Sequence, residues 1–217
     1  SIYKKTTTDL ISNRPLDPAT GYTETVTNIG EVQVKGIEAD LGVSLFRNSN
    51  PGGFNWMVNA NFTADESTVV DLGQDTDNIN IGGLFSDLSN FAVAGRPFGI
   101  IMGTRVLRDD DGNKVVASTG SYVEEQGLFE IGDPNADWRL NVSNGFNYKN
   151  LNFGFDISYR HGGDVYANTI SALVGRGLTT DTEDRVSTFI LPWVKADGSV
   201  NDIQINNSDF KGKGMCA

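Results

Sequence analysis

The stretch WRLNVSNGFNYKNLNFGFDISYR, residues 138–160, decides the fold. Apolar and polar residues alternate along it, in one run before Lys149 and Asn150 and in a second run after them. Successive side chains of a β-strand point to opposite faces of the sheet, so each run predicts a strand with one apolar and one polar face. The two-residue link between the runs predicts an antiparallel hairpin.

The same alternation occurs nearer the N-terminus. Residues 37–45 and 56–64 place an apolar side chain at every second position, and Asn50-Pro51-Gly52-Gly53 between them predicts a tight turn. A weaker strand, with an uncertain register, is predicted over residues 2–11. The sequence therefore predicts an all-β, antiparallel fold with about five long strands.

Composition restricts the class of protein. The chain has 217 residues and 38% of them are hydrophobic, but no apolar run approaches the roughly 20 residues of a membrane helix. A net charge of -11 disfavours nucleic acid as a partner. The one histidine, His161, and the one cysteine, Cys216, cannot by themselves build a histidine-centred catalytic pair or a metal site, so we expect no enzyme activity and no cofactor.

Alternation alone fits either a soluble β-sandwich or a transmembrane β-barrel. Loop lengths favour the barrel, because residues 47–53 and 149–150 are short links whereas residues 65–137 and the segment after His161 are long. Aromatic residues at strand ends also favour it, since they match the girdles at the two lipid boundaries: Trp56, Trp138, Tyr148 and Tyr159.

We predict two regions. Residues 1–160 form part of a barrel, with a long extracellular loop at about 65–137, and residues 161–217 form a further extracellular loop region. Within the first loop, Gly99–Leu107 and Lys114–Ala117 predict a hairpin that does not span the membrane. An odd set of strands leaves two unpaired edges, so we expect that the chain does not close a barrel by itself and that both of its ends are interrupted.

Several motifs resemble a known family in their order along the chain. They are Tyr3-Lys4-Lys5-Thr6 with Asp9-Leu10-Ile11, Asn28-Ile29-Gly30 with Lys35-Gly36-Ile37-Glu38, Phe54-Asn55-Trp56, Gly95-Arg96-Pro97 with Gly99, Ile131-Gly132-Asp133-Pro134-Asn135-Ala136-Asp137, Tyr148-Lys149-Asn150, and Gly162-Gly163-Asp164-Val165-Tyr166. Over most of residues 2–170 the sequence resembles the barrel region of SusC/RagA-like TonB-dependent outer-membrane transporters.

This resemblance implies a barrel of roughly 22 strands in the outer membrane of a Gram-negative bacterium. It implies import of oligosaccharides or peptides, a SusD-like surface lipoprotein as partner, contact with outer-membrane lipid, and energy from the TonB complex. From this resemblance we expect the family's amino-terminal domain, TonB box, plug and final strands to lie outside this sequence. Two alternatives remain open: a passive porin or outer-membrane assembly component, and a soluble carbohydrate-binding β-sandwich.

Candidate functional residues fall into three groups. Aromatic residues of the predicted surface loops either stack on sugar rings or pack within the loops: Phe85, Phe91, Tyr122, Phe129 and Tyr166. Asp133 and Asp137 either form a rigid turn before the strand at Trp138 or contact a substrate or partner. Polar residues of the predicted strands are assigned to the barrel lumen: Glu38, Asp40, Asp156 and Arg160. Asp109-Asp110-Asp111-Gly112 resembles a calcium loop but predicts a hairpin turn, because it lacks the glutamate at the twelfth position.

Overall fold

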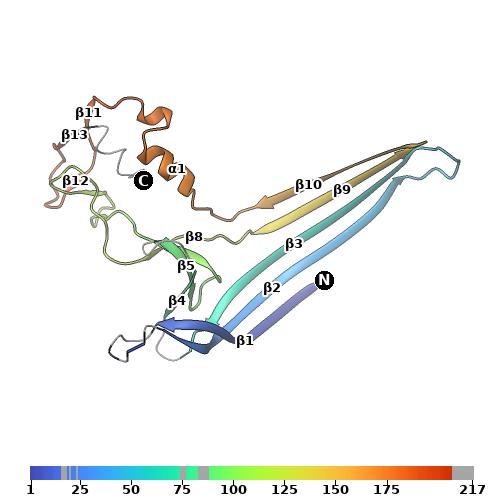
Figure 1. Ribbon diagram of the computed structural model, residues 1–217, viewed down its shortest axis with the longest axis horizontal. Helices are drawn as coiled ribbons and strands as arrows, with labels where there is room; N and C mark the ends of the chain where they lie inside the picture. Colours follow the sequence, from blue (N-terminus) through green and yellow to red (C-terminus); the bar gives the residue numbers. More distant parts are fainter. Residues whose placement is uncertain (16–18, 20, 23, 74–76, 83–87, 207–217) are drawn as a thin grey trace. The chain divides into compact units, whose positions relative to one another are not determined.

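The computed structural model describes residues 1–15, 19, 21–22, 24–73, 77–82 and 88–206 (Figure 1). The chain divides into two compact units, one of Ser1–Ile101 with Gly132–Asp164 and one of Met102–Ile131 with Val165–Ala217. Among the described residues, no helix is long and apolar enough to cross a membrane.

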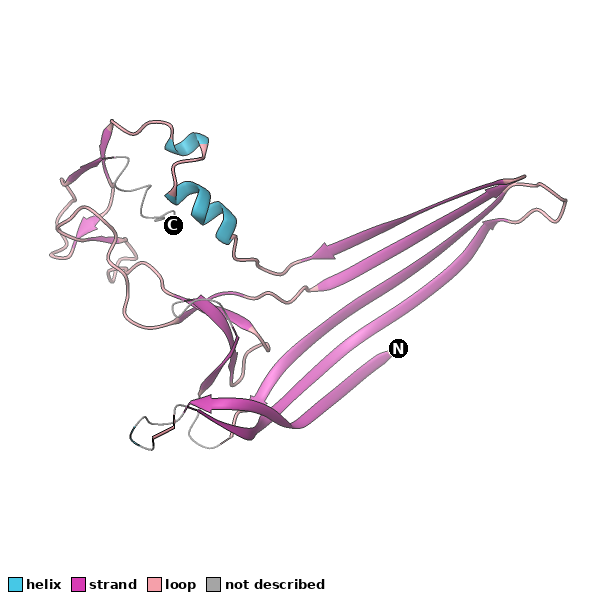
Figure 2. Cartoon of the chain, in the orientation of Figure 1, coloured by secondary structure: helices cyan, strands magenta, loops and turns pink. Residues whose placement is uncertain are grey.

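The first unit is built on a five-stranded antiparallel sheet, which we call the main sheet (Figure 2). Its order is β1-β2-β3-β9-β10, where β1 is Ile2–Pro15, β2 is Glu24–Phe46, β3 is Asn55–Asp71, β9 is Trp138–Tyr148 and β10 is Leu151–His161. All five predicted strands are present. β2 begins well before residue 37 and β3 continues beyond residue 64, so both are longer than the alternation alone indicates.

The register joins the apolar positions of neighbouring strands into one face. Residues paired across antiparallel strands lie on the same face of the sheet. One continuous row is Leu41, Ala60, Val142 and Ile157, and the next row toward the turns is Val43, Val58, Asn144 and Phe155. A row on the opposite face is Asp40, Asn61, Asn141 and Ser158. The predicted separation of an apolar face from a polar face is therefore present across four strands.

The two short turns lie at the same end of the main sheet. The Asn50 carbonyl accepts a hydrogen bond of 3.0 Å from the Gly53 amide, and Gly52 has a φ of 78°. Lys149, in the β9–β10 turn, has a φ of 53°, which L-residues seldom adopt. Its amide donates to the Gly52 carbonyl at 3.2 Å, so the two predicted turns are neighbours.

Aromatic rings gather at both ends of the apolar face. Near the turns, Trp56 stacks on Phe146 with ring centroids 5.3 Å apart, and this cluster also contains Phe46, Phe54, Phe153 and Phe155. At the opposite end, Trp138 packs against Phe62, Tyr159 and His161. Of the strand-end aromatics that the sequence predicts, Trp56, Trp138 and Tyr159 belong to these two cross-strand clusters, with aliphatic rows between them.

The polarity of the two faces is exchanged beyond the row of Ile2, Ile37 and Ala64. On the face that is apolar up to this row, the next positions are polar: Lys4, Lys35 and Glu66, then Thr6, Gln33 and Thr68. On the other face, Val32 and Val69 are buried and form a core with Leu72, Ile79 and Ala92. β1, β2 and β3 therefore continue past the apolar band with their buried side reversed.

A small sheet supplies the other side of this core. β4 (Asn78–Gly82), β5 (Leu88–Val93) and β6 (Ile100–Gly103) are neighbours in that order. Both backbone polar groups of Val69 are hydrogen-bonded to the segment after β5. Its amide donates to the Arg96 carbonyl, and its carbonyl accepts from the Gly95 amide. Residues 65–137, which the sequence predicts as one long loop, thus contain ordered strands, of which β8 (Phe129–Gly132) is the last.

The second unit has short elements. Asp109 and Asn113 close the predicted hairpin turn, with a backbone hydrogen bond of 3.0 Å. β7 (Val115–Val116) pairs in parallel with β12 (Val194–Lys195), and β11 (Thr188–Ile190) pairs with β13 (Gln204–Asn206). The sequence predicts no helix, but α1 (Asn168–Gly175) and the 3-10 turn η2 (Thr180–Thr182) are present. α1 has neither a side-chain cap nor a charged residue in its terminal turns, so the usual sequence signals are missing.

Candidate functional site

The polar face of the main sheet carries the four residues assigned to a lumen. Glu38, Asp40, Asp156 and Arg160 are all exposed, and their register places them on the face opposite to the apolar rows. The Asn61 side-chain amide donates to the Asp40 carboxylate, and the Arg160 guanidinium donates to the Pro134 carbonyl. Their common face is as predicted, whereas the lumen itself stays a prediction.

A hollow of about 830 Å³ lies in the first unit where β3 and β9 separate. Pairing between these strands ends at Thr63 and Arg139, and Asp65 lies 3.8 Å from the Arg139 guanidinium. The polar side chains lining the hollow come from β1, β2, β3 and the segment before β9: Tyr3, Lys4, Lys35, Asp65, Glu66, Ser67, Asp133, Asn135 and Asp137. This set includes Asp133 and Asp137, two of the predicted contact residues.

Tyr3 forms the floor of the hollow with Gly36, its partner across the sheet. A Cβ atom at position 36 would lie 2.5 Å from the Tyr3 ring, a distance that real contacts do not reach. The absence of a side chain at Gly36 therefore lets the ring lie flat across the strand, as aromatic residues do over strand glycines. Tyr3 was not singled out as a site residue from the sequence, because its strand has the least regular alternation.

Asp133 and Asn135 build the turn that precedes β9. The Asp133 carboxylate accepts hydrogen bonds from the Asn135 amide at 2.9 Å and from the Asn135 side chain at 2.7 Å. The Asp133 amide donates to the Asp164 carboxylate at 2.9 Å, and the Asp164 amide donates back to the Asp133 carbonyl at 2.6 Å. These hydrogen bonds join two motifs of the sequence analysis, at residues 131–137 and 162–166.

Asp137 also contacts a residue that follows it at a distance in the sequence, His161. Its carboxylate lies 3.0 Å from His161 Nδ1, and the His161 ring stacks on Trp138 at 5.3 Å. Gly162 has a φ of 73°, and a Cβ atom there would lie 2.5 Å from the Asp137 carboxylate. These contacts hold Asp133 and Asp137 in the turn before β9, and contact with a substrate stays a prediction.

The chemistry of this hollow is that of polar contact. Carboxylates, an amide and a phenol can bind the hydroxyl or amide groups of a ligand through hydrogen bonds. Within the described residues, no group of three or more His, Cys, Asp or Glu side chains could hold a metal ion.

A second hollow, of about 810 Å³, lies within the second unit. Tyr122 lines it with Arg108 and Lys114, and the Lys114 ammonium lies over both the Tyr122 ring, at 5.1 Å, and the Trp193 ring, at 5.7 Å. Arg105 pairs with Glu125 through two hydrogen bonds of 2.6 and 3.0 Å and covers the Phe129 ring at 3.8 Å. These hydrogen bonds lower the pKa of Glu125 and raise the pKa of Arg105.

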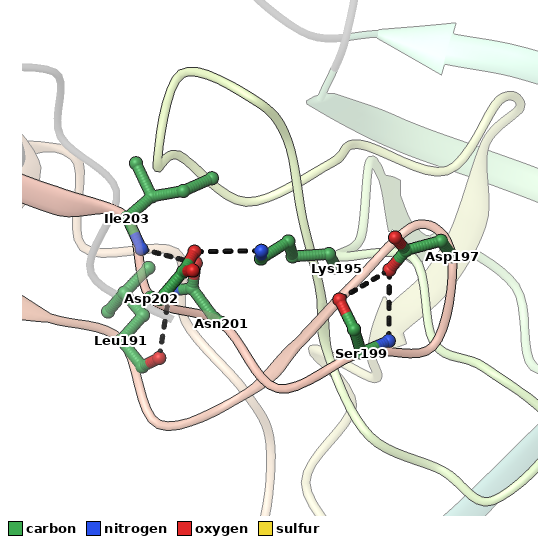
Figure 3. A network of polar contacts seen from close by, with 7 residues as sticks. All are labelled: Leu191, Lys195, Asp197, Ser199, Asn201, Asp202 and Ile203. Carbon is green, nitrogen blue, oxygen red and sulfur yellow. Dashed lines mark hydrogen bonds and ion pairs between the residues drawn. The ribbon is translucent and has the colours of Figure 1, made fainter.

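Residues 191–203, where the sequence offers little to interpret, are ordered by a polar network (Figure 3). The buried Asn201 side chain donates to the Leu191 carbonyl at 3.0 Å and accepts from the Ile203 amide at 3.1 Å. Lys195 bonds Asp202 at 2.7 Å, which raises the pKa of Lys195 and lowers that of Asp202. The hydroxyl and amide of Ser199 lower the pKa of Asp197.

The predicted aromatic contacts do not come together in one place. Phe91 is only 6% exposed and lies in the small sheet, so its ring packs inside the protein. Tyr122 and Phe129 lie in the second unit, Tyr166 is 48% exposed, and Phe85 lies outside the described residues. Packing within the loops is what the structure shows for Phe91 and Phe129, and a role in ligand contact stays a prediction for all five.

Comparison with known proteins identifies relatives of one kind. No family model matches the chain. TonB-dependent receptor P26 of Formosa agariphila is 24% identical over 183 residues, a match that covers 76% of this chain. TonB-dependent receptor P3 of the same organism is 25% identical over 217 residues, covering 86% of this chain, and receptor P39 is 36% identical over 81 residues, covering 37%. This chain spans only 18%, 20% and 7% of P26, P3 and P39, respectively.

Solved structures share the fold. The RagAB peptide transporter superposes with a TM-score of 0.54 at 16% identity, over 74% of this chain and 18% of that chain. The RagAB peptide importer in its closed-closed state gives a TM-score of 0.55 at 18% identity, over 75% of this chain and 19% of that chain. The resemblance to TonB-dependent outer-membrane transporters, inferred from the motifs, is confirmed over the matched part of the chain.

Proposed function

We propose that this chain is part of the wall of a TonB-dependent transporter in the outer membrane of a Gram-negative bacterium. The homology to TonB-dependent receptors and the shared fold support an outer-membrane transporter. As the resemblance implies, the complete barrel has roughly 22 strands, of which the main sheet contributes five.

The apolar face of the main sheet carries the proposal. Its aliphatic and aromatic side chains are open to the surroundings of the chain; Leu41, for example, is 64% exposed. The band from Ala64 to Trp56 is roughly 27 Å long along β3, which is about 20 Å of height at a strand tilt of about 40°. This value is close to the apolar band of roughly 25 Å found in outer-membrane barrels. In a soluble β-sandwich, a second sheet would have to cover these rows.

The proposed cargo is an oligosaccharide or a peptide. The similar solved structures are those of a peptide transporter and importer, which supports the peptide alternative. The polar face, with Asp40 and Arg160, would offer hydrogen bonds to such a cargo. A SusD-like surface lipoprotein and the TonB complex complete the proposal, and both rest on the family resemblance.

Uptake by cells that express the full-length protein tests this function. Because import through a TonB-dependent receptor needs energy, we expect a protonophore to abolish uptake of radiolabelled oligopeptides or oligosaccharides while surface binding continues. Deleting the gene should remove both uptake and binding. A passive porin, the alternative function, would give uptake that is unaffected by the protonophore. At equilibrium the concentration of the solute would then be equal on both sides of the membrane.

A further inference from the structure

We infer that Lys4 and Lys35 form a binding site for the phosphate groups of a phosphorylated glycolipid in the outer leaflet. The inference goes beyond the proposed function but rests on it, because it requires lipid against the apolar face of the main sheet. It concerns the row of side chains directly beyond the apolar band.

The two lysines lie at the height of lipid headgroups. They are two residues beyond Ile2 and Ile37, the last apolar positions of their strands on this face. Two residues of strand extend roughly 7 Å, or about 5 Å of height at a tilt of about 40°. The headgroup region on each side of a bilayer is about 5–8 Å thick, the difference between a total of about 40–45 Å and a core of about 30 Å.

Beyond this row, the opposite face of the same strands is closed. Val32 and Val69 are buried there in the core that the small sheet completes. Lys4 and Lys35 are exposed and share the face of Ile2 and Ile37, since positions two apart on a strand lie on the same side. The lysines therefore project toward the membrane surface and away from that core.

Among the described residues, the two lysines of this row are not ion-paired. Lys4 and Lys35 are direct partners across the sheet, which brings their Cβ atoms to about 4.5–5.5 Å, and like charges placed in this way destabilise a sheet. Neither ammonium group forms an ion pair within the described part of the chain. A single phosphate between them would neutralise both charges and accept hydrogen bonds from both.

The nearby carboxylates lie beside other side chains, except Glu66. Of the acids that line the same hollow, Asp65 lies beside Arg139, Asp133 bonds Asn135, and Asp137 bonds His161. Glu66 faces the same way as the lysines, as the cross-strand partner of Lys35, and it would compete with a phosphate. The row thus carries two positive charges and one negative charge, which favours an anion.

Competition between two glycolipids tests the site in the full-length protein. The protein is equilibrated in detergent with equal amounts of lipid A that carries its phosphates and of lipid A from which they have been removed. The bound lipids are then counted by native mass spectrometry. We expect a preference of roughly 30-fold for the phosphorylated form, the equivalent of about 1 kcal/mol for each lysine near an anionic surface.

The variants separate charge from fold. In Lys4→Gln/Lys35→Gln the preference should fall close to one, whereas Lys4→Arg/Lys35→Arg and the opposite-face control Lys5→Gln should keep it. Glu66→Gln should increase it. An unchanged preference in the double Gln variant overturns the inference, as does full competition by inorganic phosphate at millimolar concentration, which would make the site one for a free anion.

The two proposals fail in different ways. If the protein binds neither form of lipid A and stays in solution without detergent, the proposed function fails. If it binds both forms equally and remains dependent on detergent, the apolar face contacts lipid as proposed and only the phosphate site is wrong.

Discussion

Gly30 is a residue at which the backbone itself restricts the sequence. It has a φ of 61°, and a Cβ atom there would lie 1.8 Å from the Asp71 carbonyl oxygen. We expect Gly30→Ala to reduce the free energy of unfolding by at least about 1–3 kcal/mol, because both the left-handed conformation and the close approach oppose a side chain. Equilibrium unfolding in detergent measures the difference.

Gly73 provides the matched control for Gly30. It also has a positive φ, of 82°, but a Cβ atom there would meet nothing within 4 Å. Gly73→Ala should therefore cost only the conformational term of about 1 kcal/mol. Equal losses in the two variants would show that the contact with Asp71 has no effect.

The pKa of Glu125 depends on its ion pair with Arg105. Its pKa is lowered, first by hydrogen bonds from the Arg105 side chain and then by that charge, against the cost of desolvation. The pKa of Glu125 in the folded protein lies below the ordinary 4.5, so this pair stabilises the second unit at neutral pH. That stabilisation is lost as the pH falls through the lowered pKa.

The variant Arg105→Gln should return the pKa of Glu125 toward its ordinary value. A carboxyl carbon titration followed by NMR measures both proteins. We expect a higher titration midpoint of Glu125 in the variant, and an unchanged midpoint would mean that the two side chains do not interact in solution.

At the scale of the strand, neighbouring residues should tolerate charge very differently. Leu41 lies in the middle of the apolar band, whereas Asp40 lies on the polar face. Leu41→Arg should destabilise the inserted protein by roughly 2–4 kcal/mol, the cost of a cation on the lipid face near the bilayer centre, and Asp40→Arg should be tolerated. Unfolding from lipid vesicles measures both, and equal tolerance would contradict the assigned faces.

Beyond Ile37 the same strands should show the reverse preference. Val69 is fully buried, on the face that is polar along the apolar band. Thr68 lies on the other face, which is apolar along that band. We expect Val69→Arg to abolish packing of the small sheet, which removes the protection of Ile79 and Ala92 from hydrogen exchange. Thr68→Arg should leave that protection intact.

Strand patterns could be predicted from the sequence where one face meets one environment throughout. This holds for residues 37–45, 56–64 and 138–159, whose alternation is regular. The extensions of β2 and β3 escaped prediction because the apolar parity changes within each strand, so that the pattern over the whole strand cancels. α1 escaped prediction because its eight residues lack capping signals.

The candidate site was less predictable than the strands. Asp133, Asn135 and Asp137 are recognisable as a turn from their residue types, but their attachment to Asp164 and His161 depends on contacts between distant parts of the chain. Tyr3 becomes part of the hollow only because β1 pairs with β2 opposite Gly36. Local sequence carries no signal for such a pairing.

At the scale of the whole molecule, two environments follow each other along the same strands. Lipid on one face and water on the other accounts for the band between the aromatic clusters, and a protein core against water accounts for the rows beyond Ile37. In the proposed barrel, we expect the height of this exchange to match the outer boundary of the membrane. It also explains why a chain with mean hydropathy of -0.27 can still present a continuous apolar surface.

Cysteine labelling along β2 tests whether the two environments are exchanged in this way. After Cys216 has been changed to Ser in the full-length protein, single cysteines are placed from residue 32 to residue 44 and exposed to a charged, membrane-impermeant maleimide in outer-membrane vesicles. We expect labelling at 38, 40, 42 and 44 but not at 39, 41 and 43. Nearer the N-terminus we expect the opposite parity, with labelling at 33 and 35 but not at 32 and 34. One unbroken parity from 32 to 44, or equal labelling at every position, would contradict it.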